Sequence, residues 1–315
     1  MPRSARTLLA IVAALLFAGC GSDEAGSSGG VAVVATTTIV GDLARQVGGD
    51  AASVTQLLNA NTDAHEYEPR PDDVVAVAGA DVVLQSGDGL DRWAADVVEQ
   101  SGTDAPLIDL AAKLQVRRPG EREGDEASRY DPHWWHDPRN VVTAVGEIRD
   151  ALTAADPGDK ATYARNAAAY TARVKALDAA IARCFASIAP TARKLVTDHD
   201  AFGYFAGRYD LEVVGAVIPS QTTGAQSSAA DVAALTRLIE REDVKAIFPE
   251  RSLNQKLARA IADQAGVLAG DELYGDSLGK DGTPGATYLG MQAANADAIV
   301  GGLTGGSERC EAPAA

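Results

Sequence analysis

DPGDKATYARNAAAYTARVKALDAAIARCFAS, residues 156–187, is the segment on which the predicted architecture depends. Its apolar residues recur at mostly three- and four-residue steps from Tyr163 to Ile181, which is the period of an α-helix. A single helix of about 30 residues would be about 45 Å long and could cross a whole two-lobed molecule as a rigid beam. Two shorter helices that break near Ala180 would fit the same pattern.

On both sides of this segment, predicted strands and helices alternate. Runs rich in β-branched residues, such as 31–36 and 193–198, predict strands, and the stretches between such runs have helical periodicity. This alternation is typical of βαβ units around a parallel sheet. We therefore predict an α/β protein of two lobes with mainly parallel sheets, with lobes at 31–155 and 189–315 and a linking helix at 156–188.

The first 30 residues predict export and membrane attachment. Residues 1–19 place two arginines before an apolar run that is too short for a permanent membrane span, as in a secretory signal peptide. Small residues precede Cys20, which resembles the bacterial lipobox, although ordinary secretion with an unmodified cysteine is the alternative. Residues 20–30 are polar and suit a flexible tether. We expect an extracytoplasmic protein anchored to the cell membrane by lipid on Cys20.

The charge of the chain restricts its partners. It has 44 acidic and 28 basic residues, a formal charge of −16. Phosphate contacts need clustered lysine and arginine, so we expect no nucleic-acid partner. An acidic chain attracts cationic ligands, but a merely soluble acidic surface explains the charge equally well.

Two further cysteines, Cys184 and Cys310, lie in the part of the chain that would be exported. Two cysteines in an exported protein favour one disulfide, which here would join the C-terminal tail to the end of the long helix. Two free thiols or a metal role are the alternatives, and the chain offers no CxxC pair for the latter.

The four histidines of the chain occur in three motifs: TDAHEYEP (62–69), DPHWWHDP (131–138) and VTDHDAFGYF (196–205). Ligands gather at the carboxyl ends of strands in open α/β sheets, and four polar residues follow predicted strands: His65, His199, Glu250 and Asp276. Imidazole and carboxylate suit borderline divalent cations. Taken singly, each histidine is more often an ordinary surface or core residue, so spacing alone does not predict a site.

Several motifs together resemble the ZnuA/TroA family of zinc- and manganese-binding lipoproteins of bacterial ABC importers. They are HEYEP, DPHWWHDP, TDHDAFGYFAGRY, GDSLG and YLGMQAANADAI, and the resemblance extends from Val31 to Leu303. It implies two α/β lobes joined by one long helix, with a metal site in the cleft between the lobes. It also implies a monomer that is not an enzyme and that delivers its ion to an ABC importer permease.

Carried over position by position, the resemblance implies four metal ligands: His65, His133, His199 and Asp276. In family members that resemble manganese importers, the third of these four ligands, here His199, tends to be a glutamate. Three nitrogens and one carboxylate favour Zn²⁺, whereas Mn²⁺, the alternative, gains more from oxygen ligands. The sequence departs from the family pattern at Ala64, where proline is usual, and loop 115–130 lacks the histidines of some zinc-specific members.

Other polar residues near the motifs are expected to support the ligands. A ligating imidazole usually donates its second N–H to a carboxylate or carbonyl. We expect three carboxylates to have this role: Glu66, Asp131 and Glu250. We leave His136 outside the metal site, as a neighbouring residue rather than a ligand.

Two other classes of function fit the sequence less well. A secreted zinc hydrolase would need a second helical ligand, but in HEYEP the position of the second histidine of HExxH is Pro69. A haem- or siderophore-binding protein would need broad aromatic walls, and only 5% of the residues are aromatic.

Overall fold

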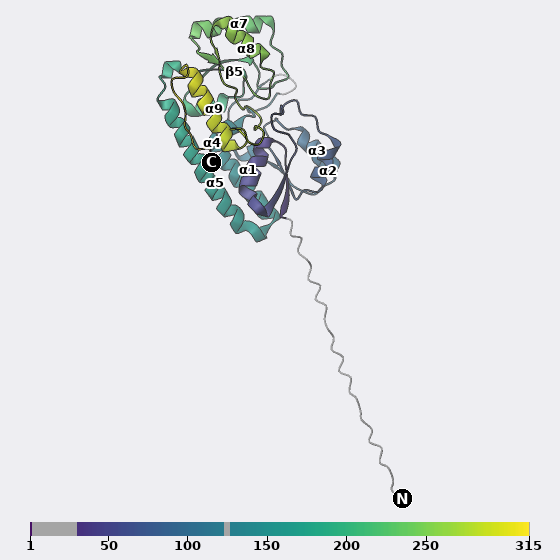
Figure 1. Ribbon diagram of the computed structural model, residues 1–315. Helices are drawn as coiled ribbons and strands as arrows, with labels where there is room; N and C mark the ends of the chain where they lie inside the picture. Colours follow the sequence, from purple (N-terminus) through teal and green to yellow (C-terminus); the bar gives the residue numbers. More distant parts are fainter. Residues whose placement is uncertain (2–29, 123–126, 315) are drawn as a thin grey trace.

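The computed structural model describes Met1, residues 30–122 and residues 127–314 (Figure 1). The predicted signal peptide and the lipidation of Cys20 therefore lie outside the described residues. Within the described ranges, no helix combines the length and the apolar character needed to cross a bilayer.

The N-terminal lobe is built on one parallel sheet with strand order β2-β1-β3-β4. Its strands are β1 (Val31–Ala35), β2 (Ala52–Gln56), β3 (Val82–Gln85) and β4 (Leu107–Asp109). Its helices are α1 (Thr38–Gly48), α2 (Pro71–Ala78), α3 (Trp93–Ser101) and α4 (Pro138–Ala155). Short 3₁₀ turns lie at η1 (Gly49–Ala51), η2 (Leu110–Lys113) and η3 (Trp134–His136).

Successive side chains of the central strands are buried on opposite faces of this sheet, as the two-residue period of a strand requires. Val33 packs in the core that includes α1 and α4, whereas Val34 packs with Val77 of α2 and Val97 of α3. Helices therefore cover both faces, which is the usual arrangement of a parallel sheet.

The C-terminal lobe has a less regular sheet. Strands β5 (Lys194–His199) and β6 (Glu212–Ile218) form one parallel pair, and β7 (Ala246–Ile247) and β8 (Leu268–Ala269) form another. A parallel bridge between Thr197 and Phe248 connects the two pairs. The helices are α6 (Gly203–Tyr209), α7 (Ala229–Glu242), α8 (Lys256–Ala265) and α9 (Tyr288–Leu303).

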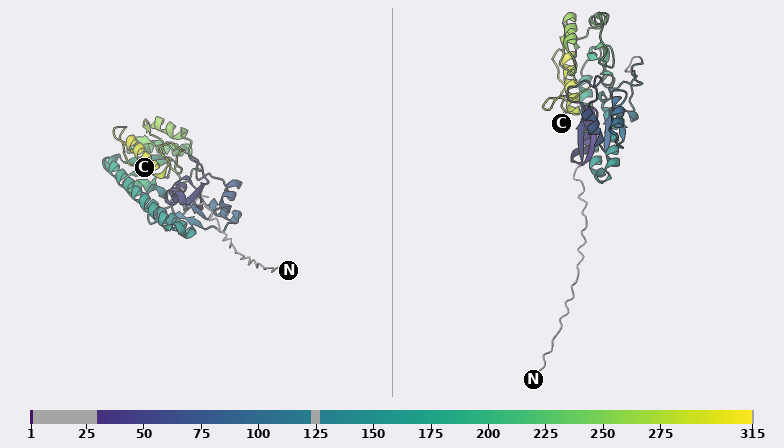
Figure 2. Two further views of the ribbon diagram at one scale, coloured as in Figure 1. Left: turned by 60° about the horizontal axis from the view of Figure 1, so that its bottom comes forward. Right: turned by 90° about the vertical axis from the view of Figure 1, so that its right-hand side faces the viewer.

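The long helix predicted from the sequence is α5 (Lys160–Ala186), which has 27 residues and no break near Ala180. It follows the 3₁₀ turn η4 (Pro157–Asp159), and η5 (Pro190–Ala192) comes after it. Its buried face packs against α1 and α4 of the first lobe and against α6 and α9 of the second. Figure 1 and the left view of Figure 2 show α5 passing along both lobes.

The two lobes share one hydrophobic core. Buried residues of α1 and α4, such as Ile39 and Val145, belong to the same cluster as Phe205 of α6 and Ile299 of α9. The predicted disulfide is present between Cys184 and Cys310, with 5.5 Å between the Cα atoms, so the C-terminal tail is fastened to the end of α5. On the side of α5, the lobes are therefore firmly joined.

Candidate metal centre

The structure brings the four proposed ligands together from both lobes. His65 lies in the loop after β2 and His133 is the residue before η3, so both belong to the first lobe. His199 is the last residue of β5, and Asp276 lies in the loop between β8 and α9. One ligand atom from each residue lies within 4.8 Å of the corresponding atoms of the other three.

The spacing of these atoms fits a tetrahedral ion. The Nε2 atom of His133 is 3.2 Å from Nε2 of His65 and 3.2 Å from Nε2 of His199. The carboxylate oxygens of Asp276 are 3.3–3.5 Å from the three Nε2 atoms. A tetrahedron with metal–ligand bonds of about 2.0–2.1 Å has edges of about 3.3–3.4 Å. Five of the six ligand pairs therefore have nearly the spacing of a tetrahedral zinc site, counting both oxygens of Asp276, and the sixth pair, His65 and His199, lies within 4.8 Å.

Burial and the neighbouring imidazoles determine the ionisation of Asp276, the fourth proposed ligand. The residue is 1% exposed, and both of its carboxylate oxygens are buried without a hydrogen-bond partner among the described residues. Burial alone would raise the pKa of Asp276, but the adjacent His199 and His133 outweigh it and hold the pKa well below its ordinary value. The neighbouring imidazoles supply positive charge to this carboxylate in the metal-free chain, and a metal ion would take over that role when it displaces their protons.

Two buried carboxylates orient two of the imidazoles. The Nδ1 atom of His133 is 2.7 Å from Oδ1 of Asp131, and Nδ1 of His199 is 2.7 Å from Oε1 of Glu250. When Nδ1 donates its hydrogen to a carboxylate, the lone pair of Nε2 is free for a metal. Asp131 and Glu250 thus contact the imidazoles of His133 and His199, and their role in supporting metal ligands stays a prediction.

The third expected carboxylate, Glu66, is placed differently. It is exposed, and in the described ranges no hydrogen bond connects it to an imidazole. Instead, Asp63 accepts the backbone N–H of His65 at 3.0 Å and so shapes the loop that carries this ligand. Asp63 was not expected to have this role, although an aspartate two residues before a loop residue commonly forms such a turn.

His136 lies beside the site but outside the group of four ligands. Its ring stacks on Phe202 with 4.4 Å between centroids, and neither ring nitrogen has a hydrogen-bond partner among the described residues. Burial first, and then the charge of His133, lower the pKa of His136 to about 3. It is therefore a neutral packing residue at physiological pH.

Hydrogen bonds to Trp135, a residue between His133 and His136, connect the two lobes beside the proposed ligands. The sequence patterns did not predict these hydrogen bonds. Trp135 Nε1 donates to the backbone oxygen of Gly275, next to Asp276. The backbone oxygen of Trp135 accepts from Tyr288 Oη and from Gln292 Nε2, each at 3.0 Å. These contacts fix the DPHWWHDP segment against the loop that carries Asp276.

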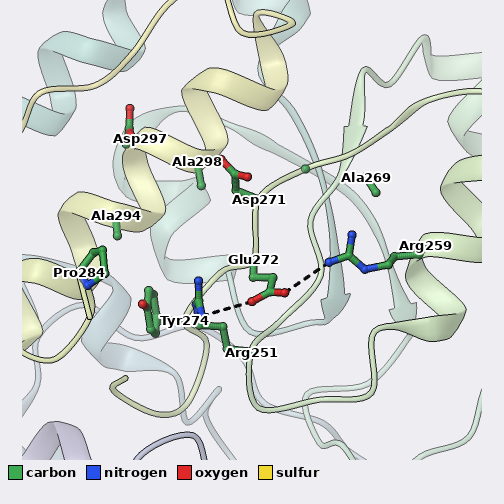
Figure 3. A pocket seen from close by; sticks show the side chains of 11 residues that line it. Arg251, Arg259, Ala269, Asp271, Glu272, Tyr274, Pro284, Ala294, Asp297 and Ala298 are labelled. Atoms are coloured by element: carbon green, nitrogen blue, oxygen red, sulfur yellow. Dashed lines mark hydrogen bonds and ion pairs between the residues drawn. The ribbon is translucent and has the colours of Figure 1, made fainter. Parts of the chain in front are cut away.

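A separate cavity of about 490 Å³ lies on the C-terminal lobe (Figure 3). Arg251 and Arg259 both point toward Glu272, at 3.3 Å and 3.4 Å. None of the four ligands lines this cavity, and its lining contains neither histidine nor cysteine. Its charged groups largely neutralise one another, so we do not assign it a role in metal binding.

The chain is similar to several known proteins. The family model "ZnuA: Zinc-uptake complex component A periplasmic" matches residues 33–302. The manganese-binding lipoprotein MntA of Halalkalibacterium halodurans is 30% identical over 297 residues, which cover 93% of this chain and 96% of the relative. The zinc-binding lipoprotein AdcA of Streptococcus pneumoniae is 31% identical over 302 residues, covering 93% of this chain and 59% of AdcA.

A solved structure has the same fold. The periplasmic zinc-binding protein TroA of Treponema pallidum aligns with a TM-score of 0.78 at 28% identity, and the alignment covers 87% of this chain and 99% of TroA. The two-lobed α/β architecture predicted from the sequence is therefore confirmed.

Proposed function

This chain belongs to the ZnuA family, and we propose that it captures Zn²⁺ outside the cell membrane and delivers the ion to an ABC importer. As a member of this family, the chain is a metal-binding solute-binding protein of an ABC transporter. The identity of the metal, the four ligands and the partner permease are our proposals. The proposed ligands are His65, His133, His199 and Asp276.

One observation supports zinc above the others: three imidazole nitrogens and one carboxylate that lie within 4.8 Å of one another. Zinc readily forms four-coordinate sites with nitrogen and oxygen ligands. Manganese gains more from oxygen-rich sites. The names of the relatives include both metals, so the choice depends on the ligand set, and manganese remains the second candidate.

The arrangement favours transport over catalysis. A catalytic zinc site usually has three protein ligands and an open position for water or substrate. Four protein ligands would occupy every position of a tetrahedral ion. A carrier needs only to hold the ion and release it.

The position of the site between lobes suggests how the ion is released. Two ligands, His65 and His133, belong to the first lobe, and the other two belong to the second. A small displacement of one lobe against the other would separate the pairs and change the coordination, as in other hinged binding proteins. We propose that contact with the permease favours this displacement.

We also propose that the mature chain is a lipid-anchored monomer. Support for the anchor comes from the lipobox-like sequence before Cys20 and from relatives named as lipoproteins. Incorporation of a labelled fatty acid that is lost in Cys20→Ser would test the anchor, and analytical ultracentrifugation of the soluble chain would test the monomer.

Metal analysis tests the choice of ion. We expect protein purified without added metal, and then exposed to equimolar Zn²⁺ and Mn²⁺, to retain one zinc ion per chain. Replacement of a ligand in His133→Ala should abolish tight binding. Preferential retention of manganese would reverse the assignment, and unchanged zinc affinity in His133→Ala would exclude the proposed site.

A further inference from the structure

The candidate metal site has one side that is less completely covered than the others. His133, His199 and Asp276 are buried, and His65 is partly buried as a whole residue, although its side chain is only 3% exposed. A gap of about 10 Å³ lies beside His65. Residues of both lobes line this gap, among them Asp88, Glu121, Gln221 and Thr222. The site therefore comes closest to solvent at His65, where the two lobes meet.

A pair of hydrogen bonds closes the lobes at this position. The backbone N–H of Gln221, which follows β6, donates to Oε1 of Glu121 in the first lobe at 2.5 Å. Nε2 of Gln221 donates to the backbone oxygen of Pro119 at 3.3 Å. We call these two contacts the cleft latch. In the same loop, Gly224 lies against Glu66, where an added Cβ would be 2.7 Å from Oε1.

The loop that forms the latch also contains polar groups that the closed state does not satisfy. Oε1 of Gln221 and Oγ1 of Thr223 are buried and have no hydrogen-bond partner among the described residues. Water could hydrogen-bond to both atoms once the loop moved outward. Because unpaired buried polar groups destabilise the closed state, opening here requires less free energy than the number of contacts suggests.

Contacts elsewhere between the lobes are more completely buried and better paired. Thr38 Oγ1 of α1 accepts the backbone N–H of Leu278 at 2.9 Å. Asp42 of α1 accepts the backbone N–H of Tyr288 at 2.9 Å, and all four residues of these two contacts are buried. Together with α5, these contacts join the lobes firmly, so we expect separation to begin at the latch.

His65 is also the ligand with the least support from neighbouring side chains. Asp131 and Glu250 orient the imidazoles of His133 and His199, but no carboxylate in the described ranges accepts from Nδ1 of His65. When the imidazole of His65 moves away it loses its contact with Asp276 at 3.5 Å, but no carboxylate on its Nδ1 side holds it back.

From these observations we infer that Glu121 and Gln221 control the passage of the metal ion, and that His65 is the first ligand to separate when the latch opens. This inference rests on the proposed function, because it concerns the ion held by the four ligands. Glu121 and Gln221 are positioning residues, because they determine how often the site opens. The four ligands determine how tightly the site binds the metal ion.

The first experiment measures release of Zn²⁺ from the loaded protein into an excess of a chromophoric chelator by stopped flow. We expect Glu121→Ala to accelerate release about tenfold, the effect of losing one hydrogen bond to a charged acceptor. Capture should accelerate too, so the affinity should change less than either rate. Glu99→Ala is the matched control, because it removes the same charge from an exposed position on α3.

The second experiment prevents the latch from opening. In a chain with Cys20→Ala, Glu121→Cys and Gln221→Cys would be joined by a short, reducible reagent that bridges two thiols. We expect release of Zn²⁺ to slow at least tenfold in the bridged protein and to recover on mild reduction. Neither single-cysteine variant, treated with the same reagent, should release zinc more slowly, and Glu121→Cys should release it faster, as Glu121→Ala does, because both lack the carboxylate that accepts from Gln221.

The outcomes separate this inference from the proposed function. If the unmodified protein binds no zinc, the proposed function and the latch both fail. If zinc binds tightly but neither Glu121→Ala nor the verified bridge changes the rate of release, the ion passes elsewhere and the latch alone is excluded.

Discussion

Asp131 accepts two hydrogen bonds from His133 through one oxygen: Oδ1 lies 2.7 Å from the imidazole Nδ1 and 3.0 Å from the backbone nitrogen. Glu250 repeats this arrangement with His199, at 2.7 Å and 3.1 Å. In each lobe, one buried carboxylate thus fixes both the backbone and the ring of one proposed ligand. These two imidazoles are held in position before an ion arrives.

This arrangement predicts the effect of Asp131→Asn. An amide can no longer act as a negatively charged acceptor, so the orientation and basicity of His133 should weaken. Loss of such a partner usually lowers metal affinity about 10–100-fold. Competition with a chelator of known affinity would measure the change. Asp150→Asn, an exposed substitution on α4, should have no effect, and equal affinities in all three proteins would contradict the proposed role of Asp131.

The disulfide between Cys184 and Cys310 should contribute to stability but not to metal affinity. It joins residues that are 126 positions apart, so it removes a large amount of conformational entropy from the unfolded chain. We expect Cys184→Ser with Cys310→Ser to lower the free energy of unfolding by about 3–5 kcal/mol. Denaturant unfolding of the metal-free proteins would measure this change. Loss of zinc affinity in a variant that remains folded would show that the bond also shapes the site.

His136 should make stability fall in acid. Its pKa is about 3 in the folded protein, because burial and the charge of His133 oppose protonation, whereas an unfolded histidine has a pKa of about 6.5. Below pH 6.5 the unfolded chain therefore binds a proton that the folded chain does not. The loss is about 2 kcal/mol by pH 5 and continues until the pH approaches 3.

His136→Leu tests this prediction because leucine does not titrate. We expect the free energy of unfolding of the variant to depend less steeply on pH between 6.5 and 4 than that of the unmodified protein. The comparison uses slopes, since loss of the stacking on Phe202 also shifts the absolute values. Parallel curves would show that this imidazole is protonated in the folded state.

Local sequence patterns predicted the helices and the longer strands well, because helix caps and apolar periodicity depend on residues that are neighbours in the chain. Asp137 caps α4 through the backbone nitrogen of Arg139, and Pro138 is the first helical residue, a pairing typical of helix starts. The apolar period of residues 156–187 predicted α5, although the first turn is 3₁₀ rather than α-helical. Strands β7 and β8 have only two residues each, so their positions depend on pairing more than on their own sequence.

The site required information that local patterns do not contain. His65 and Asp276 are 211 positions apart (276 − 65), and no spacing rule relates them. Resemblance to a family supplied that connection. Contacts that join the lobes, such as Trp135 with Gly275 and Glu121 with Gln221, depend on how the completed lobes fit together, and no local pattern predicts them.

Binding of zinc should release protons. Burial would lower the pKa of His133, but Asp276 and Asp131 outweigh it and raise the pKa to about 10. For His199, burial is similarly outweighed by Glu250 and Asp276, and the pKa rises to about 9. A protonated imidazole cannot bind a metal, so in the metal-free protein protons compete with zinc at neutral pH. Affinity should therefore increase with pH, by about tenfold per unit for each proton displaced.

Calorimetry at pH 7 in two buffers with different heats of ionisation would count the protons. The observed enthalpies should differ by at least the difference between the two buffers' heats of ionisation, because at least one of the two imidazoles must lose its proton to bind zinc. His136→Leu should give the same count, since His136 is already neutral at this pH. Equal enthalpies in the two buffers would mean that the imidazoles are neutral before zinc binds, and affinity would then decline only below about pH 6.5, the ordinary pKa of histidine.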